Sequence, residues 1–224
     1  MTQPLDHLTV VFFGDSITEG QYVHHSQRWT EMTANRLRAE FASRLDPARM
    51  FSYVHGISGE TTRQALERFP RQVQQLAPDV LTIQFGLNDC NCWDSDRGVP
   101  RVSAAAYRAN LVEMIDRARR FDTRQIVLST NHPTLRHRPM VSGETLEERR
   151  KKYNDIVRDV ARETQVTLCD IETAFAFAGR EQLADLLLPE PDVLHLSPAG
   201  HQIYSDAITP ALMRAVNAVL DESR

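Results

Sequence analysis

Cysteine is scarce in this chain of 224 residues, and the three cysteines do not form a metal-binding pattern. Cys90, Cys92 and Cys169 lack the paired Cys-x-x-Cys spacing of a structural zinc site. The eight histidines also lack the spacing that places two of them around zinc on one helix face. We therefore expect free thiols, no metal and no cofactor. A metal or redox role for Cys90 and Cys92 is the minor alternative.

Long apolar runs and an excess of basic residues are missing as well. No stretch approaches the ~18 apolar residues of a membrane span, and the N-terminus lacks the charged region of a signal peptide. The net charge of −4 provides no positive field for nucleic acid or an anionic membrane. We expect a cytoplasmic protein that neither binds nucleic acid nor inserts into a membrane. A homo-oligomer is compatible with the sequence, which contains no signal for one.

Short apolar segments alternate with amphipathic segments along the whole chain. The apolar runs predict five strands, and the amphipathic segments between and after them have the spacing of helices. This alternation predicts a parallel sheet with helices on both faces. The fold class is therefore α/β: a three-layer α/β/α sandwich with a five-stranded parallel sheet, in one domain over residues 1–224. The predicted strands are residues 8–13, 50–55, 80–85, 125–130 and 166–169.

Small or polar residues follow the predicted strands directly. GDSITEG, which contains Ser16, follows the first strand, and Gly59 and Asn88 lie in the exits of the second and third strands. The carboxyl ends of parallel strands share one edge of the sheet, where ligands bind. Ser16 is therefore a candidate nucleophile. A plain helix cap and a phosphate-binding loop are the alternatives at this position.

A serine nucleophile needs a base and a group that orients the base, and one late segment contains both. Asp192 and His195 are three residues apart, so a tight bend can bring the carboxylate onto one imidazole nitrogen. The other nitrogen then remains for Ser16. This pattern predicts a Ser16–His195–Asp192 catalytic triad.

Acyl transfer also places negative charge on the carbonyl oxygen of the substrate, and this charge requires hydrogen-bond donors. Three donors lie in the strand exits: the backbone N–H groups of Ser16 and Gly59, and the side-chain amide of Asn88. We expect them to form an oxyanion hole. A plain turn glycine at residue 59 and an Asx turn at residue 88 are the alternatives.

The sequence resembles the SGNH (GDSL-type) hydrolase family in four blocks along residues 14–195. These blocks are GDSITEG, GISGETT, GLND and DVLH. The resemblance implies a flavodoxin-like topology and metal-free ester hydrolysis by Ser16, with His195 as base and Asp192 as its partner. It also implies that Ser16, Gly59 and Asn88 donate to the oxyanion. Ile17 replaces the leucine of the family motif, which conserves side-chain volume.

Other polar and aromatic residues receive weaker assignments. The loop of residues 90–102 is either a solvated connection or a substrate-binding segment, and Trp93 within it is a candidate pocket residue. His132 and the pair His24-His25 are candidates for the pocket border or simply hydrated. We interpret Asp15 and Asp89 as acceptors that fix their loops, and we interpret His201 as structural.

These observations together predict a serine-dependent carboxylic-ester hydrolase whose substrates are small-molecule esters with short, acetyl-type acyl groups. Carbohydrate O-deacetylase and lysophospholipase or thioesterase activities are the alternatives within the enzyme class. A non-catalytic flavodoxin-like ligand-binding domain is the alternative outside it, although neither nucleotide-binding glycine motif is present.

Overall fold

A five-stranded parallel sheet forms the centre of the computed structural model, which describes residues 6–178 and 182–222. The strand order is β2-β1-β3-β4-β5, the flavodoxin-like order that the resemblance implies. The predicted fold class is confirmed. The strands are β1 Leu8–Gly14, β2 Met50–Gly56, β3 Val80–Gln84, β4 Gln125–Ser129 and β5 Thr167–Cys169.

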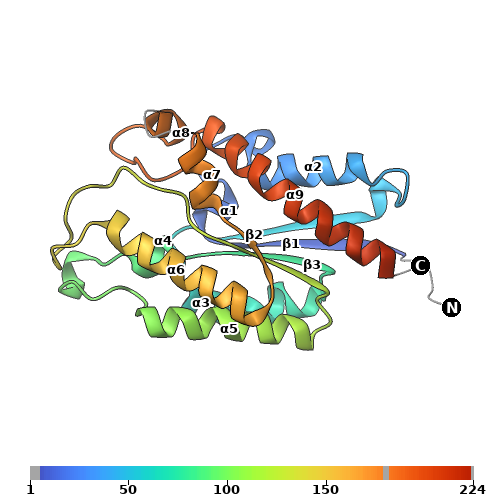
Figure 1. The fold of residues 1–224 in the computed structure, drawn as a ribbon, viewed down its shortest axis with the longest axis horizontal. Coiled ribbons are helices and arrows are strands. Elements are labelled where there is room, and N and C mark those ends of the chain that lie inside the picture. Colours follow the sequence, from blue (N-terminus) through green and yellow to red (C-terminus); the bar gives the residue numbers. More distant parts are fainter. Residues whose placement is uncertain (1–5, 179–181, 223–224) are drawn as a thin grey trace.

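Helices cover both faces of the sheet (Figure 1). One face carries α2 Trp29–Glu40 and α9 Pro198–Glu222, and the other carries α3 Thr62–Gln72, α5 Ala104–Arg120 and α6 Leu146–Thr164. Four shorter helices complete the part of the chain that the structure describes. They are α1 Ser16–Glu19, α4 Leu87–Cys90, α7 Ile171–Phe177 and α8 Leu183–Leu186.

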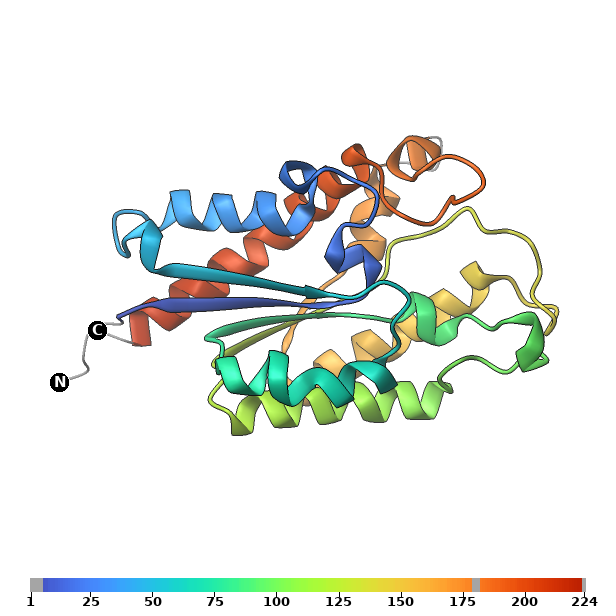
Figure 2. The same cartoon turned by 180° about the vertical axis from the view of Figure 1, so that it is seen from behind.

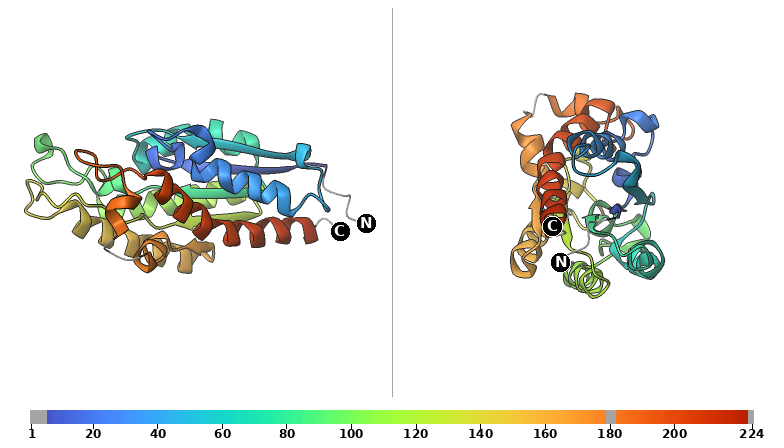
Figure 3. Two further views of the ribbon diagram at one scale, coloured as in Figure 1. Left: turned by 90° about the horizontal axis from the view of Figure 1, so that it is seen from above. Right: turned by 90° about the vertical axis from the view of Figure 1, so that its right-hand side faces the viewer.

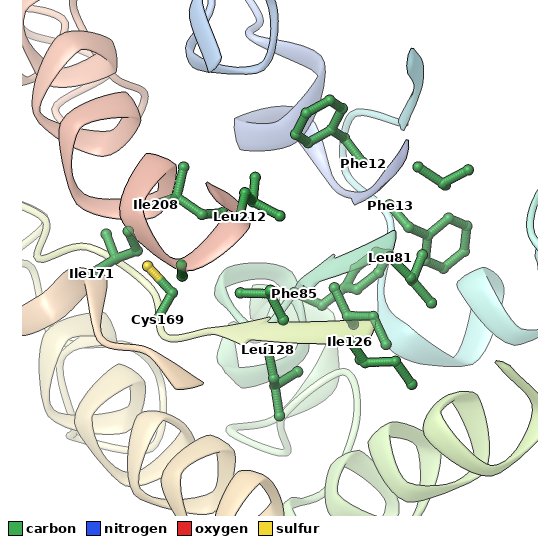
Figure 4. Close-up of a cluster of buried hydrophobic side chains, with 14 of the residues drawn as sticks. Phe12, Phe13, Leu81, Phe85, Ile126, Leu128, Cys169, Ile171, Ile208 and Leu212 are labelled. Atoms are coloured by element: carbon green, nitrogen blue, oxygen red, sulfur yellow. The ribbon is translucent and has the colours of Figure 1, made fainter. Parts of the chain in front are cut away.

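The alternation of side chains along β1 fills the core on both sides of the sheet. Phe12 packs edge-to-face on Trp29 of α2, at 5.4 Å between ring centroids. Phe13 points to the opposite face, where it packs on Phe69 of α3 at 5.3 Å. Phe85, Leu81 and further apolar side chains extend this core across the sheet (Figure 4). The uniformly apolar first strand is therefore buried on both faces.

Two elements differ from what the apolar and amphipathic patterns suggest. The second predicted strand, residues 50–55, is the edge strand β2, and its Phe51, Tyr53 and Val54 are exposed although helices were expected on both faces of the sheet. An apolar run does not indicate whether its strand has one neighbour or two. The amphipathic pattern of residues 61–76 is divided between two elements: α3 ends at Gln72, and a separate 3₁₀ turn, Gln74–Leu76, follows it.

The strand pairing places three strand exits at the same level. Gly14, at the end of β1, pairs with Gly56 of β2 and with Gln84 of β3. Two long loops, residues 91–103 and 130–145, project beyond the sheet at this end (Figures 1 and 3). Among the described residues no helix is both long and apolar enough to cross a membrane.

Candidate active site

Ser16, His195 and Asp192 form one chain of hydrogen bonds at the carboxyl end of the sheet. His195 Nε2 lies 2.9 Å from Ser16 Oγ. His195 Nδ1 lies 2.8 Å from Asp192 Oδ2. The structure therefore brings together the three side chains that the sequence singled out, although 179 positions separate the serine from the histidine.

Ser16 is presented by a tight turn between β1 and the short helix α1. Asp15 caps this helix, because its carboxylate accepts the N–H of Ile17 at 2.9 Å. A Cβ atom on Gly14 would lie 2.0 Å from Thr18 Oγ1 and 2.7 Å from the carbonyl oxygen of Gln84. Only glycine allows the chain to turn this closely. The turn places α1, which begins at Ser16, directly after β1 (Figure 2).

The segment of residues 192–195 is folded around the carboxylate of Asp192. Asp192 Oδ1 accepts the backbone N–H groups of Leu194 at 2.9 Å and His195 at 2.6 Å, and Oδ2 faces the imidazole. Partial burial acts to raise the pKa of Asp192, but the hydrogen bonds from the backbone and ring of His195 outweigh burial and hold this pKa below its ordinary value. Asp192 is therefore anionic at neutral pH and can stabilise a protonated imidazole.

A buried layer behind this segment holds its backbone in place. His132 Nε2 lies 2.8 Å from the carbonyl oxygen of Leu194, and the N–H of Leu135 donates to Val193 at 3.0 Å. Burial lowers the pKa of His132 to about 4, so the ring is neutral and donates through Nε2. The expectation that His132 borders the pocket is not met, because its side chain is completely buried beside Phe175. The position of a residue after a strand does not reveal which way its side chain points.

The two other predicted oxyanion donors, Gly59 and Asn88, lie in the exits of β2 and β3. Gly59 adopts a left-handed backbone with φ +76°, which favours glycine. Asn88 is half-buried on the short helix α4. Arg101 links them, because its Nη1 lies 2.9 Å from the carbonyl oxygen of Gly59 and 3.4 Å from Asn88 Oδ1. No pattern in the sequence pointed to Arg101.

Comparison with known proteins agrees with this arrangement. Residues 12–203 match the model of the GDSL-like lipase/acylhydrolase family. The chain belongs to this family. A similar protein is the uncharacterized lipoprotein YqeF of Bacillus subtilis (strain 168), which is 30% identical over 222 residues, or 89% of this chain and 87% of that protein.

Solved structures of enzymes share the fold of this GDSL-like chain. LAE5, an alpha/beta hydrolase enzyme from the metagenome of Lake Arreo, Spain, is 25% identical with a TM-score of 0.71, covering 91% of this chain and 94% of that chain. A catalytic mutant of Axe2, an acetylxylan esterase from Geobacillus stearothermophilus, is 22% identical with a TM-score of 0.72, covering 94% and 95%. The second likeness shows the fold alone.

Two buried carboxyl groups lie in the exits of β1 and β3 of this GDSL-like protein. Asp15 caps α1, and Asp89 Oδ1 accepts the N–H and hydroxyl of Thr62 at 2.9 and 2.5 Å. Burial raises the pKa of Asp15 to about 7 and the pKa of Asp89 to about 6. Both carboxyl groups fix their loops, as the sequence predicts.

Two exposed aromatic rings flank the site. Tyr22 packs edge-to-face on His195 at 5.2 Å between ring centroids. Its backbone has φ +70°, an uncommon conformation for a bulky residue. Tyr22 could not be identified from the sequence, because an aromatic residue two positions after a glycine turn carries no distinctive signal. The candidate pocket residue Trp93 is 58% exposed and lines a hollow of about 350 Å³ together with Arg101 and Thr61.

His24, His25, His201 and the three cysteines take no part in this chain of hydrogen bonds. His201 is buried, its Nδ1 accepts the N–H of Trp29 at 3.3 Å, and burial lowers its pKa to about 3, which fits the structural role predicted for it. His24 and His25 are exposed, and His24 caps a 3₁₀ turn. All three cysteines are free and buried, and burial raises the pKa of the Cys90 thiol.

Proposed function

We propose that this member of the GDSL-like family hydrolyses carboxylic esters through an acyl-enzyme intermediate on Ser16. The observation that carries the proposal is the hydrogen-bonded chain from Ser16 Oγ through His195 to Asp192, at 2.9 and 2.8 Å. A serine hydroxyl becomes a nucleophile only when a positioned base removes its proton. His195 is within hydrogen-bond distance to do so, and Asp192 holds the ring by its other nitrogen.

The first half of the proposed reaction transfers the acyl group to the enzyme. His195 Nε2 takes the proton of Ser16 as Oγ bonds to the carbonyl carbon of the ester. The carbonyl oxygen becomes an anion, which the N–H groups of Ser16 and Gly59 and the amide of Asn88 stabilise. The tetrahedral intermediate then collapses, the bond to the alcohol oxygen breaks, and the imidazolium gives its proton to the departing alcohol.

The second half returns the enzyme to its starting state. His195 accepts a proton from water as the water oxygen attacks the acyl carbon, and the same donors stabilise the second oxyanion. The bond to Ser16 Oγ then breaks, and Oγ recovers its proton from the imidazolium. The chain supplies the nucleophile, the base and the oxyanion donors, so the proposed reaction uses no cofactor.

Short acyl groups and a polar alcohol suit the hollow beside the proposed oxyanion donors best, because Arg101, which lines it, contacts Gly59 and Asn88. The hollow beside Arg101 is lined mainly by polar and charged side chains, among them Arg63, Gln64 and Asp96, rather than by an apolar channel for a long chain. Exposed aromatic rings such as Tyr22 and Trp93 offer flat apolar surface to a sugar ring while leaving its hydroxyls hydrated. These rings favour an O-acetylated carbohydrate as the second candidate substrate class.

A panel of acetyl, butyryl and palmitoyl esters, extended by acetylated xylo-oligosaccharides and ethyl acetate, tests the proposal. We expect kcat/KM to fall from acetyl to palmitoyl, and hydrolysis of every ester to fall at least about 10³-fold in Ser16→Ala. Preference for the acetylated sugar over ethyl acetate would support the second candidate. Undiminished hydrolysis by Ser16→Ala would overturn the proposal, and a preference for palmitoyl esters would overturn the acyl-length assignment.

The location of the protein remains a prediction. The sequence favours the cytoplasm, whereas a similar protein of Bacillus subtilis is named a lipoprotein. Fractionation of the native host, with detection of this chain in the cytosolic and membrane fractions, distinguishes the two locations.

A further inference from the structure

We infer that Arg101 is a positioning residue that orients the oxyanion donors Asn88 and Gly59, an inference that rests on the proposed function. One guanidinium nitrogen, Nη1, contacts both residues: it lies 2.9 Å from the carbonyl oxygen of Gly59 and 3.4 Å from Asn88 Oδ1. Nη1 carries two hydrogens, so it can donate to both oxygens at once.

The contact with Asn88 determines which end of its amide faces the substrate. A side-chain amide has an accepting oxygen and a donating nitrogen, and only the nitrogen stabilises an oxyanion. Arg101 holds Oδ1, so Nδ2 is turned away from the guanidinium and is available to the developing charge. With the amide reversed, the site would present an oxygen to the oxyanion and would repel it.

The contact with Gly59 fixes a residue that has little packing of its own. Gly59 is exposed, and no atom lies within 4 Å of the position that a Cβ atom would take. Neighbouring hydrogen bonds hold the turn at Ser58, whose hydroxyl donates to Gln21 at 2.7 Å. Arg101 adds a restraint on the carbonyl of Gly59 itself, which limits rotation of the backbone around the proposed donor.

Arg101 is itself held by the loop that carries it. Its backbone N–H donates to the carbonyl oxygen of Asn91 at 2.8 Å. The N–H of the next residue, Val102, donates to the carbonyl oxygen of Asp89 at 3.1 Å. The guanidinium lies over the indole ring of Trp93, 4.8 Å from the ring centroid. This loop, residues 91–103, therefore begins and ends beside Asn88. It holds the guanidinium of Arg101 against Asn88 and Gly59, the two proposed donors. This arrangement gives a role to a segment whose function the sequence left open.

A positioning role differs in its kinetics from direct binding of substrate. A residue that binds substrate in the ground state changes KM, whereas a residue that orients oxyanion donors changes kcat. A positioning residue also loses most of its effect once the group that it orients has been removed. Both differences are measurable with one small ester.

The experiment measures p-nitrophenyl acetate hydrolysis by Arg101→Met, by Asn88→Ala and by the double variant. We expect Arg101→Met to lower kcat about 10- to 100-fold with KM within about twofold, and Asn88→Ala to lower kcat about 100-fold or more. Adding Arg101→Met to Asn88→Ala should cost less than about fivefold more, through Gly59 alone. Arg101→Lys, which keeps the charge and a donor, should lie between wild type and Arg101→Met and provides a second variant if Arg101→Met does not fold.

The matched control is Arg97→Met, which removes an exposed arginine from the same loop and should leave kcat unchanged. A rise in KM at constant kcat would overturn the inference, as would a full multiplicative loss on the Asn88→Ala background. An inactive Ser16→Ala together with Arg101→Met equal to Arg97→Met would overturn this inference alone. An active Ser16→Ala would instead overturn the proposed function.

Discussion

At the scale of single residues, Asp15, in the turn that carries Ser16, links the free energy of unfolding to pH. Its carboxyl group is completely buried, and one of its oxygens, Oδ2, has no hydrogen-bond partner among the described residues. Burial raises the pKa of Asp15 to about 7, against about 3.9 for an unfolded aspartate. Between these values the folded chain holds a proton that the unfolded chain has lost. The stability from the neutral acid is therefore complete below about pH 4 and falls as pH rises towards 7.

Asp15→Asn isolates this effect, because asparagine resembles the neutral acid and keeps an oxygen for the N–H of Ile17. We expect the variant to gain about 2 to 3 kcal/mol in free energy of unfolding relative to wild type between pH 5 and pH 8. Urea unfolding at both pH values measures the difference, and the contributions of buried histidines cancel in the comparison. Asp94→Asn, at an exposed position, is the control and should show no such gain. An equal difference at both pH values would contradict the account.

At the scale of elements, the carboxyl ends of the strands position the residues of the site. At the end of β1 there is no space for a side chain on Gly14. The last residue of β1, Gly14, lies against the Thr18 side chain and the Gln84 carbonyl, which belong to α1 and β3. Thr18 is completely buried and donates to the side chain of Gln84 at 3.0 Å, so it cannot move aside easily. The position of Ser16 therefore depends on the absence of one methyl group.

Gly14→Ala should lower the free energy of unfolding by about 1 to 3 kcal/mol or more and reduce kcat by displacing Ser16. Gly143→Ala is a matched control, because nothing lies within 4 Å of its added methyl group and only its φ of +85° opposes the change. We expect that variant to lose about 1 to 2 kcal/mol and to keep full activity. Chemical denaturation and ester hydrolysis of both variants provide the comparison. A Gly14→Ala protein as stable and active as wild type would refute this explanation.

Sequence patterns predicted the strands well where a strand is buried along its whole length. They predicted burial poorly where it depends on whether the strand lies inside the sheet or at its edge. The apolar runs at residues 8–13 and 80–85 correspond to β1 and β3, two of the three strands that lie inside the sheet. The exposed face of β2 could not be predicted, because its edge position follows from the strand order. Thr145 and Glu148 carry a capping-box signal that lies within four residues, and the structure forms this capping box at the start of α6.

At the scale of the whole molecule, the site brings together Ser16, near the start of the sequence, and His195, near its end. Motif blocks predicted that Ser16 and His195 would meet, since a triad is defined by the groups it needs. Arg101 and Tyr22 could not be predicted, because their contacts depend on how two loops fold against the strand exits. The buried position of His132 was missed for the same reason. Candidate catalytic residues that lie in short motifs can be recognised in a sequence. The residues that contact and position them can be identified only in the structure.

The central claim is that Ser16 is a nucleophile activated by His195, and covalent labelling tests it most directly. An organophosphonate should phosphonylate Ser16, with release of the leaving group, and mass spectrometry should find the added mass on the peptide that contains residue 16. Labelling should be absent in Ser16→Ala and at least about 10²-fold slower in His195→Ala. Labelling at another residue, or equal rates in wild type and His195→Ala, would contradict the account.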